Sequence, residues 1–408
     1  MRYVVLGSSA AGINGVRELR RLDKEAEIVL ISKDEAIYSR CILHHYLGGE
    51  RDMDKLCFAE KDFETLYHVL WMKGRNCVGL KREEKKVLLE DGEEVSYDKL
   101  LIATGSHTFI PPVKNLKEAA NVAGFRNIED MEVLREAAKT AKHIVVMGAG
   151  LVGLDCASGF LELGVSVTMV EMAGWLLSRQ LDKRAATTYQ EAFKKRGVSQ
   201  YYGVGIAEAI LDENHRITEI ILTDGKRLPC DFVVVTAGVR SNVEFLEGSG
   251  IGLSRFGLVY DETGKTSDGD IYGAGDVSGT SPIWPVAVKE GIIAAGNMAG
   301  EKRAMTDFFA SKATMNFLGI PSMSLGDVNA DDPEARTEIR ETKESYKKII
   351  HKNGKIIGAV LQGDLAYGGI LQQLIARKID ISKVKKPVFD IDYSDFFHMK
   401  DNFEFYYE

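Results

Sequence analysis

Two glycine-rich turns contain the residues best suited to bind a phosphate. Residues 7–12 read Gly-Ser-Ser-Ala-Ala-Gly, and residues 148–153 read Gly-Ala-Gly-Leu-Val-Gly. Backbone N–H groups at the start of a helix carry partial positive charge, and small side chains let a pyrophosphate approach them. The second turn is a complete dinucleotide fingerprint. In the first turn Ser9 replaces the middle glycine, so an ordinary tight turn is an alternative. The candidate binding residues are Gly7, Ser9, Ala10, Ala11, Gly12, Gly148, Gly150, Leu151, Val152 and Gly153.

An acidic residue about 20 positions after such a turn can bind the adenosine ribose. After the second turn this residue is Glu171. Its carboxylate can accept hydrogen bonds from both ribose hydroxyls and would repel a 2′-phosphate, which favours NADH over NADPH. After the first turn the corresponding residue is Ser32, followed by Lys33. Serine accepts only one such bond well, so Asp34 or Glu35 is an alternative.

A third motif, at residues 266–276, ends in Gly-Ala-Gly-Asp. Its glycines permit close approach, and Asp276 beside Gly275 can reach a ribitol hydroxyl or a water on a flavin phosphate. Two strand-like runs enter similar glycine turns, at 99–103 and 232–236. Their candidate binding residues are Ala103, Thr104, Gly105, Ala237 and Gly238. Trp284 precedes a helical stretch, 285–300, whose start either faces a flavin carbonyl or simply packs.

Strand and helix patterns repeat around the first two turns. Strands are predicted at 2–7 and 27–31 around a helix at 13–22, and at 143–148 and 166–170 around a helix at 151–163. Each set is a βαβ unit of a doubly wound parallel sheet. Further strands are predicted at 86–89 and 217–222. Pro111-Pro112 marks a domain edge. Residues 304–408, with strand-like runs at 346–350 and 356–361 and a helix at 369–377, form a separate α+β domain.

Composition excludes several classes of protein. The chain has 408 residues and a net charge of −8, which argues against a nucleic-acid binder. No apolar run approaches the length of a membrane span, and the start lacks a secretory signal. The cysteines form no CxxC pair, so no metal site is expected, and reduced thiols fit a cytoplasmic protein. We expect core thiols at Cys57, Cys77, Cys156 and Cys230.

The ordered motifs resemble the pyridine nucleotide-disulfide oxidoreductase superfamily. They are GSSAAG, YDKLLIATGS, GAGLVGLD, TAGVRSN and SDGDIYGAGD. The resemblance implies two Rossmann-like domains, with FAD bound by 1–113 and 241–303 and NAD(P)H bound by an inserted domain at 114–240. It also implies that 304–408 is an interface domain, usually dimeric. Residues 311–328 look like its start in the NADH oxidase and nitrite reductase-like branches.

Residues 38–47 offer two alternatives within this resemblance. In peroxidase and NADH oxidase relatives a redox cysteine lies at the start of such a helix, where Cys41 falls. In rubredoxin and ferredoxin reductase-like relatives the pattern is Arg-Pro-x-Leu-Ser-Lys, which Arg40 matches, and the final Lys lies beside the flavin. His45 takes that position and is expected to pair with Asp155 across the flavin. The peroxidase relatives carry a His where this chain has Ala10, so peroxide reduction is not favoured.

These observations predict an FAD-dependent NADH oxidoreductase. The leading interpretation passes electrons to a rubredoxin, a ferredoxin or the iron–sulfur subunit of a larger dehydrogenase. One alternative is a small-molecule reductase that uses Cys41 on a coenzyme A disulfide or on oxygen. Another is a flavoprotein sensor or assembly subunit that responds to NADH. A homodimer and a place in a larger complex both stay open.

Overall fold

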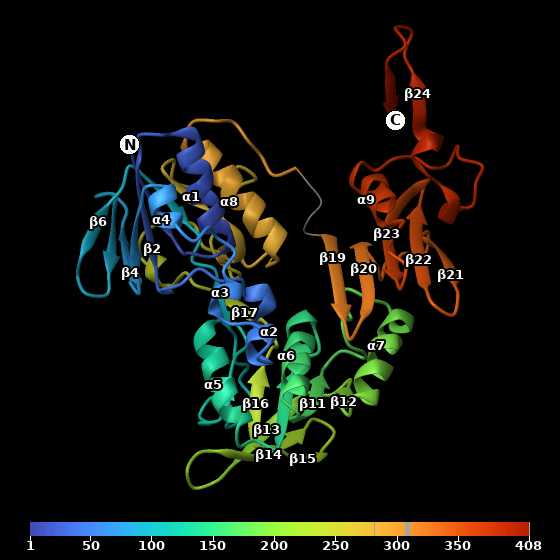
Figure 1. The fold of residues 1–408 in the computed structure, drawn as a ribbon, viewed down its shortest axis with the longest axis horizontal. Helices are drawn as coiled ribbons and strands as arrows, with labels where there is room; N and C mark the ends of the chain where they lie inside the picture. Colours follow the sequence, from blue (N-terminus) through green and yellow to red (C-terminus); the bar gives the residue numbers. More distant parts are fainter. Residues whose placement is uncertain (281, 307–310, 408) are drawn as a thin grey trace. The chain divides into compact units, whose positions relative to one another are not determined.

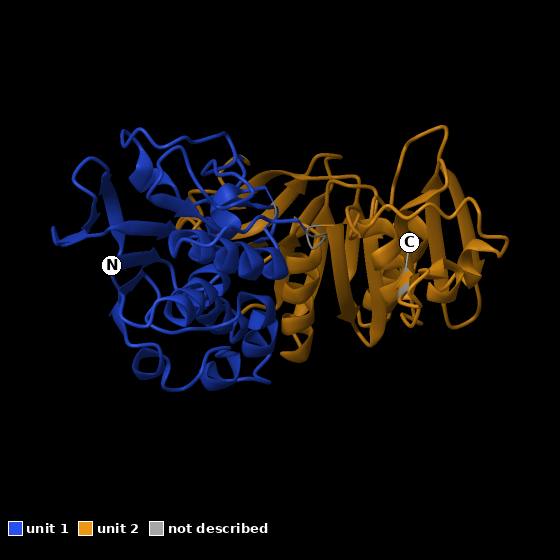
Figure 2. Cartoon of the chain, turned by 90° about the horizontal axis from the view of Figure 1, so that it is seen from above, with its two compact units in different colours: residues 1–112, 122–140, 235–306 blue, residues 113–121, 141–234, 307–408 orange. Residues whose placement is uncertain are grey.

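The computed structural model describes residues 1–280, 282–306 and 311–407 and divides into two compact units. Unit 1 comprises residues 1–112, 122–140 and 235–306, and unit 2 comprises 113–121, 141–234 and 307–408 (Figure 2). The chain therefore leaves unit 1 and returns to it. The predicted domain bounds stay a prediction.

Unit 1 is built on a five-stranded parallel sheet in the order β18-β7-β1-β2-β3. Figure 1 labels its strand β2. Its strands are β1 (Arg2–Leu6), β2 (Glu27–Ser32), β3 (Val69–Lys73), β7 (Lys99–Ile102) and β18 (Ile271–Gly273). Helices α1 (Ala10–Leu22) and α8 (Trp284–Met298) pack on one face, in a core that includes Ile13 and Ala294. The other face packs against an antiparallel sheet of β4 (Cys77–Lys81), β5 (Lys86–Leu89) and β6 (Glu94–Ser96).

Shorter elements complete unit 1. They are α2 (Leu43–Leu47), α3 (Met53–Leu56), α4 (Phe63–Leu66), α5 (Ile128–Ala138), β8 (Ser106–Thr108), β9 (Val122–Ala123), β17 (Val239–Ser241) and the 3-10 turns at Arg40–Ile42, Glu244–Leu246 and Gly275–Ser278. Strands β8 and β17 pair antiparallel close to the points where the chain crosses between units.

Unit 2 contains a second parallel sheet, with neighbouring strands in the order β12-β11-β10-β16. They are β10 (His143–Met147), β11 (Ser166–Glu171), β12 (Ser199–Tyr202) and β16 (Phe232–Val235), with helices α6 (Leu151–Glu162) and α7 (Lys183–Lys195). An antiparallel sheet of β13 (Ile206–Leu211), β14 (Ile217–Leu222) and β15 (Arg227–Pro229) follows.

The C-terminal part of unit 2 forms an antiparallel sheet in the order β19-β20-β23-β22-β21. Its elements are β19 (Lys312–Phe317), β20 (Ile320–Gly326), β21 (Arg336–Glu341), β22 (Tyr346–Lys352), β23 (Lys355–Gln362) and α9 (Gly368–Ala376). Two 3-10 turns (Val388–Asp390, Tyr393–Phe396) and a hairpin of β24 (Phe397–Met399) and β25 (Phe405–Tyr407) end the described chain.

The predicted fold class is confirmed, since two parallel α/β sheets and a C-terminal α+β sheet are present. Helix α1 begins at Ala10, three residues before the predicted start, because the small residues of the first turn already belong to the helix. The prediction of a core thiol is wrong for Cys57. This residue is exposed because it caps the end of the short helix α3.

Arg20 is a buried charged residue of unit 1. We expect Arg20→Met to lower the free energy of unfolding by about 3 kcal/mol. Its guanidinium is 7% exposed and donates to five backbone carbonyl oxygens. Methionine fills a similar volume but leaves those carbonyls without their donor. Urea unfolding followed by circular dichroism measures the change.

The matched control is Arg336→Met on the exposed strand β21, where the guanidinium has no hydrogen bond or ion pair with another described residue. A change within about 0.5 kcal/mol is expected for it. Equal effects of the two substitutions would show that the carbonyl contacts of Arg20 contribute nothing.

Candidate functional site

The first glycine turn of unit 1 is tightly constrained by its own backbone. Gly7 adopts a φ of 108°, and a Cβ there would lie 2.2 Å from the carbonyl oxygen of Ala103. A Cβ on Gly12 would lie 1.8 Å from the carbonyl oxygen of Gly7. Only glycine therefore permits α1 to start this close to β1. The small residues Ser9, Ala10 and Ala11 form the first turn of the helix or precede it.

Ser8, in the same turn, carries an unusual hydroxyl group. Its side chain is 2% exposed, and its Oγ has no hydrogen-bond partner among the described residues. A buried hydroxyl without a partner is costly. The position of this hydroxyl beside a helix N-terminus fits a site that a ligand completes.

The second glycine turn, in unit 2, is open at the corresponding place. Gly148 has a φ of 112°. A Cβ on Gly150, the N-cap residue of α6, would meet no other protein atom within 4 Å. Gly153 is buried in the helix, and Leu151 and Val152 start it with partly exposed side chains. Backbone N–H groups at this helix start are therefore accessible to an anion.

Glu171 lies at the end of β11 beside this turn. One carboxylate oxygen accepts a hydrogen bond from the amide of Ala149 at 2.7 Å, and the other accepts one from the amide of Ala173 at 2.8 Å. These bonds fix the carboxylate at the strand end, as the sequence predicts for a ribose-binding residue.

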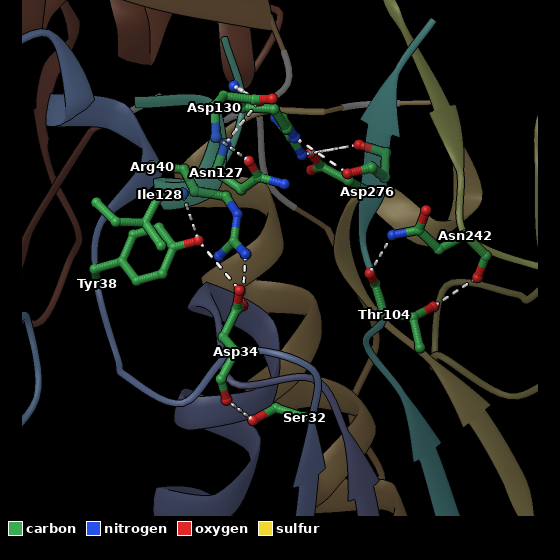
Figure 3. A network of polar contacts seen from close by, with 12 residues as sticks. Ser32, Asp34, Tyr38, Arg40, Thr104, Asn127, Ile128, Asp130, Asn242 and Asp276 are labelled. Carbon is green, nitrogen blue, oxygen red and sulfur yellow. Dashed lines mark hydrogen bonds and ion pairs between the residues drawn. The ribbon is translucent and has the colours of Figure 1, made fainter. Parts of the chain in front are cut away.

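A polar network in unit 1 surrounds the stretch after β2 (Figure 3). The Ser32 hydroxyl accepts from the indole of Trp71 at 2.8 Å and donates to the carbonyl of Asp34 at 2.6 Å. The Asp34 carboxylate binds Arg40 at 2.6 Å and accepts from the Tyr38 hydroxyl at 3.2 Å. Burial lowers the pKa of Arg40, but Asp34 and neighbouring groups raise it overall. The side chain of Lys33 is exposed. Both Ser32 and Asp34 are thus held by protein groups at the predicted ribose position.

Asp276 is held by a residue that the sequence did not indicate. Arg126, just before α5, forms an ion pair with Asp276 and donates to the Ser106 hydroxyl at 2.8 Å. Arg126 also anchors the capping box of α5, because its amide donates to Asp130 at 2.7 Å (Figure 3). The ion pair between Arg126 and Asp276 joins segments 150 residues apart, so no local sequence motif indicates it.

Glu290 of α8 was also missed. Its carboxylate accepts from the Gly275 amide at 2.7 Å and from the Tyr260 hydroxyl at 2.9 Å. Gly275 has a φ of 82°, and the two bonds hold this turn against the helix. Burial raises the pKa of Glu290 above the usual value for a glutamate. The turn that carries Asp276 is therefore fixed from both sides.

Asn242, which follows β17, is hydrogen-bonded to the glycine turn that follows β7. Its amide donates to the carbonyl of Thr104 at 2.8 Å, and the Thr104 hydroxyl donates to the carbonyl of Asn242 at 2.8 Å (Figure 3). Gly105 and Gly238 have φ values of 67° and 121°, and a Cβ on either would meet nothing within 4 Å. Ala103 is buried, whereas Ala237 is exposed.

Cys41 and His45 lie in unit 1, in the short 3-10 turn and helix α2 respectively. The Cys41 side chain is exposed, and its redox role stays a prediction. His45 Nδ1 lies 2.6 Å from a carboxylate oxygen of Glu50, and its ring lies 4.1 Å from that of His44. Burial lowers the pKa of His44 to about 4.

Trp284, at the start of α8, packs edge-on against Phe58, with 4.8 Å between the ring centres. Asp155 belongs to α6 of unit 2, so its pairing with His45 stays a prediction.

Burial raises the pKa of Asp155 to about 7, and this makes stability depend on pH. Between pH 4 and pH 7 the folded chain retains a proton that the unfolded chain has lost. The contribution of Asp155 to the free energy of unfolding should therefore fall as pH rises through this window and then level off. Asp155→Asn is expected to be more stable relative to the wild type at pH 8 than at pH 5. Urea midpoints at both pH values test this, and an unchanged difference would contradict it.

Comparisons with known proteins place the chain in a family. A family model described as pyridine nucleotide-disulphide oxidoreductase matches residues 1–291, and one described as rubredoxin NAD+ reductase C-terminal domain matches residues 312–379. The chain is 28% identical to an assimilatory nitrate reductase electron transfer subunit of Bacillus subtilis, over 95% of this chain and 51% of that protein. The chain thus spans about half the length of that relative.

Two further likenesses cover nearly the whole of both chains. An NADH-dependent phenylglyoxylate dehydrogenase subunit epsilon of Aromatoleum evansii is 28% identical, over 94% of this chain and 93% of the relative. The crystal structure of a ferredoxin reductase from Rhodopseudomonas palustris superimposes with a TM-score of 0.85 at 25% identity, covering 95% and 98% of the two chains.

The chain belongs to the pyridine nucleotide-disulphide oxidoreductase family. It is an oxidoreductase of that family, whose cofactors are FAD and NAD(H). The turns fit these groups. The unpartnered Ser8 hydroxyl and the close approach of Gly7 to Gly12 suit a dinucleotide in unit 1, and the open Cβ position of Gly150 suits one in unit 2. Among the described residues, no helix is long and apolar enough to cross a membrane and no metal-ligand cluster occurs.

Proposed function

We propose that this chain is an FAD-dependent NADH oxidoreductase that passes electrons to a protein acceptor such as a rubredoxin, a ferredoxin or an iron–sulfur subunit. The match of residues 312–379 to the rubredoxin NAD+ reductase C-terminal domain carries the proposal. The names of relatives that are electron transfer or dehydrogenase subunits support it.

In this function the residues of unit 1 would hold FAD, and we propose 1–113 with 241–303 as its domain. The turn at 7–12 offers backbone N–H groups to the pyrophosphate. Arg40 and Arg126 are held in ion pairs with Asp34 and Asp276. Asp276, fixed by Arg126 and the Gly275 turn, offers a carboxylate to a hydroxyl of the ribityl chain. When bound, FAD supplies the chemistry that accepts a hydride and releases electrons singly.

The inserted region, 114–240, would hold NADH. The α6 helix start receives the pyrophosphate, and the carboxylate of Glu171 accepts from the ribose hydroxyls while repelling a 2′-phosphate. This arrangement supports NADH over NADPH. Asp155, with a pKa of about 7, can hold or release a proton near neutral pH on the same helix.

A cytoplasmic location and assembly through residues 304–408, either as a homodimer or inside a larger dehydrogenase complex, belong to the same proposal. An NADH-responsive sensor would differ by slow flavin bleaching, over minutes, when NADH is added.

A second candidate, reduction of a coenzyme A disulfide or of oxygen, rests on the exposed Cys41 thiol at the start of α2. Cys77, Cys156 and Cys230 are less suited to attack. Burial raises the pKa of Cys77 to about 11 and that of Cys230 to about 12, and it raises the pKa of Cys156 well above its usual value. A thiol with a raised pKa carries little thiolate at neutral pH.

Cys41→Ser separates the two candidates, and we expect it to leave turnover with protein acceptors within about twofold of the wild type, because electron transfer from flavin to an iron centre needs no thiol. The flavoprotein is titrated anaerobically with NADH and then offered rubredoxin, ferredoxin and coenzyme A disulfide. Cys57→Ser is the control for loss of an exposed thiol. Disulfide reduction that vanishes only in the Cys41 variant, without turnover of protein acceptors, would favour the second candidate. Failure of NADH to bleach the flavin would reject both.

A further inference from the structure

A surface cavity in unit 1 is not used by the proposed function. It has a volume of about 420 Å³ and lies between α2, the following loop, α3 and α5. Tyr46, Glu50, Arg51, Asp52, Lys55 and Arg135 contribute to its lining.

Two arginines of this cavity lack carboxylate partners within the part of the chain that the structure describes. The guanidinium of Arg51 donates only to the carbonyl of Lys55, at 3.4 Å. The guanidinium of Arg135 lies over the ring of Tyr46, 4.7 Å from its centre. Lys55 adds a third positive charge, 3.5 Å from Asp52. Three cations from three segments therefore border one cavity.

The acidic groups of the cavity already have partners. The Glu50 carboxylate lies 2.6 Å from His45 Nδ1, and Asp52 caps α3 by accepting from the Lys55 amide at 3.0 Å. Glu132, on α5, accepts from the Tyr46 hydroxyl. Since these carboxylates are occupied, Arg51 and Arg135 retain their capacity to bind an external anion.

We propose that this cavity binds a small phosphorylated molecule. The planar fork of an arginine matches phosphate oxygens in a bidentate way, and two such forks suit a doubly charged group. The cavity exceeds what one phosphate needs and falls within the range of about 300–1,000 Å³ typical of small-molecule sites.

The wall of this cavity is also bonded to His45. The amides of Glu50 and Arg51 donate to the His45 carbonyl at 2.9 and 3.1 Å. A ligand bound to Arg51 would therefore contact the loop at residues 50–51, whose amides are hydrogen-bonded to His45.

Pyrophosphate is the probe for this site, and isothermal titration at constant ionic strength measures it. The full-length FAD-loaded protein is saturated with NAD+ so that the second turn is filled. The wild type is expected to bind one pyrophosphate, and the double variant Arg51→Gln/Arg135→Gln is expected to bind it at least about tenfold more weakly, since each arginine contributes a charge-assisted hydrogen bond. The control is Arg336→Gln, which removes an exposed arginine on β21 and should bind as the wild type does.

Two results would overturn the proposal. One is the absence of binding by the wild type, and the other is equal binding by the wild type and the double variant. Where the double variant fails to fold, Arg51→Gln alone, at an exposed position, carries the test with the same two readouts.

Discussion

Replacing Gly150 with alanine is expected to raise the KM for NADH by about 30-fold, with FAD content and the free energy of unfolding unchanged. Gly150 caps α6 with a φ of −81° and a ψ of −170°, which alanine adopts without strain. An added Cβ meets no protein atom within 4 Å. The methyl group would instead occupy the space through which a pyrophosphate approaches the helix start, at a cost of about 2 kcal/mol. Steady-state kinetics with NADH measure the change.

Gly369→Ala in α9 is the matched control. Its added Cβ also meets nothing within 4 Å, and the residue lies far along the chain from both glycine turns. Its KM for NADH should equal that of the wild type. If Gly150→Ala also keeps the wild-type KM, the second turn is not where NADH places its phosphates.

Local patterns were sufficient to predict the bounds of several elements. The predicted strands at 86–89 and 217–222 agree residue for residue with β5 and β14, and the helix at 151–163 ends one residue later than α6. Each of these segments combines a clear period with a turn signal at its end. The order of the C-terminal strands, β19-β20-β23-β22-β21, could not be predicted, because the pairing of β20 with β23 joins strands that are not neighbours in the sequence.

The sequence located the position of a candidate site residue where a motif sets its spacing, and the binding role of that residue stays a prediction. Glu171 lies where the spacing from the second turn predicts, and its carboxylate is fixed beside that turn. Arg126 and Glu290 were missed, since each acts on the turn of Asp276 from an element with no motif of its own. For Ser32 the sequence indicated the position but not the contacts. Its spacing was visible, but its bonds to Trp71 and Asp34 depend on packing against β3.

Replacing Gly12 with alanine is expected to abolish FAD binding and to lower the free energy of unfolding by about 3 kcal/mol. The added Cβ would lie 1.8 Å from the carbonyl oxygen of Gly7 and 3.4 Å from Val5. A backbone oxygen cannot be moved by side-chain rotation, so α1 must shift away from β1. That shift would change the position of the helix N-terminus that faces the Ser8 hydroxyl. The purified variant should be colourless, and its urea midpoint should fall.

Gly252→Ala, also in unit 1, separates this effect from the mere addition of a methyl group. Its Cβ would lie 3.8 Å from Val259, an ordinary packing distance, so colour and stability should be retained. The Gly12 and Gly150 variants together then distinguish two roles of glycine. At Gly12 the alanine methyl collides with the protein itself, and stability and FAD should be lost together. At Gly150 the methyl collides only with a ligand, and affinity for NADH should be lost alone. A yellow Gly12→Ala protein with the wild-type midpoint would show that the first turn does not hold FAD.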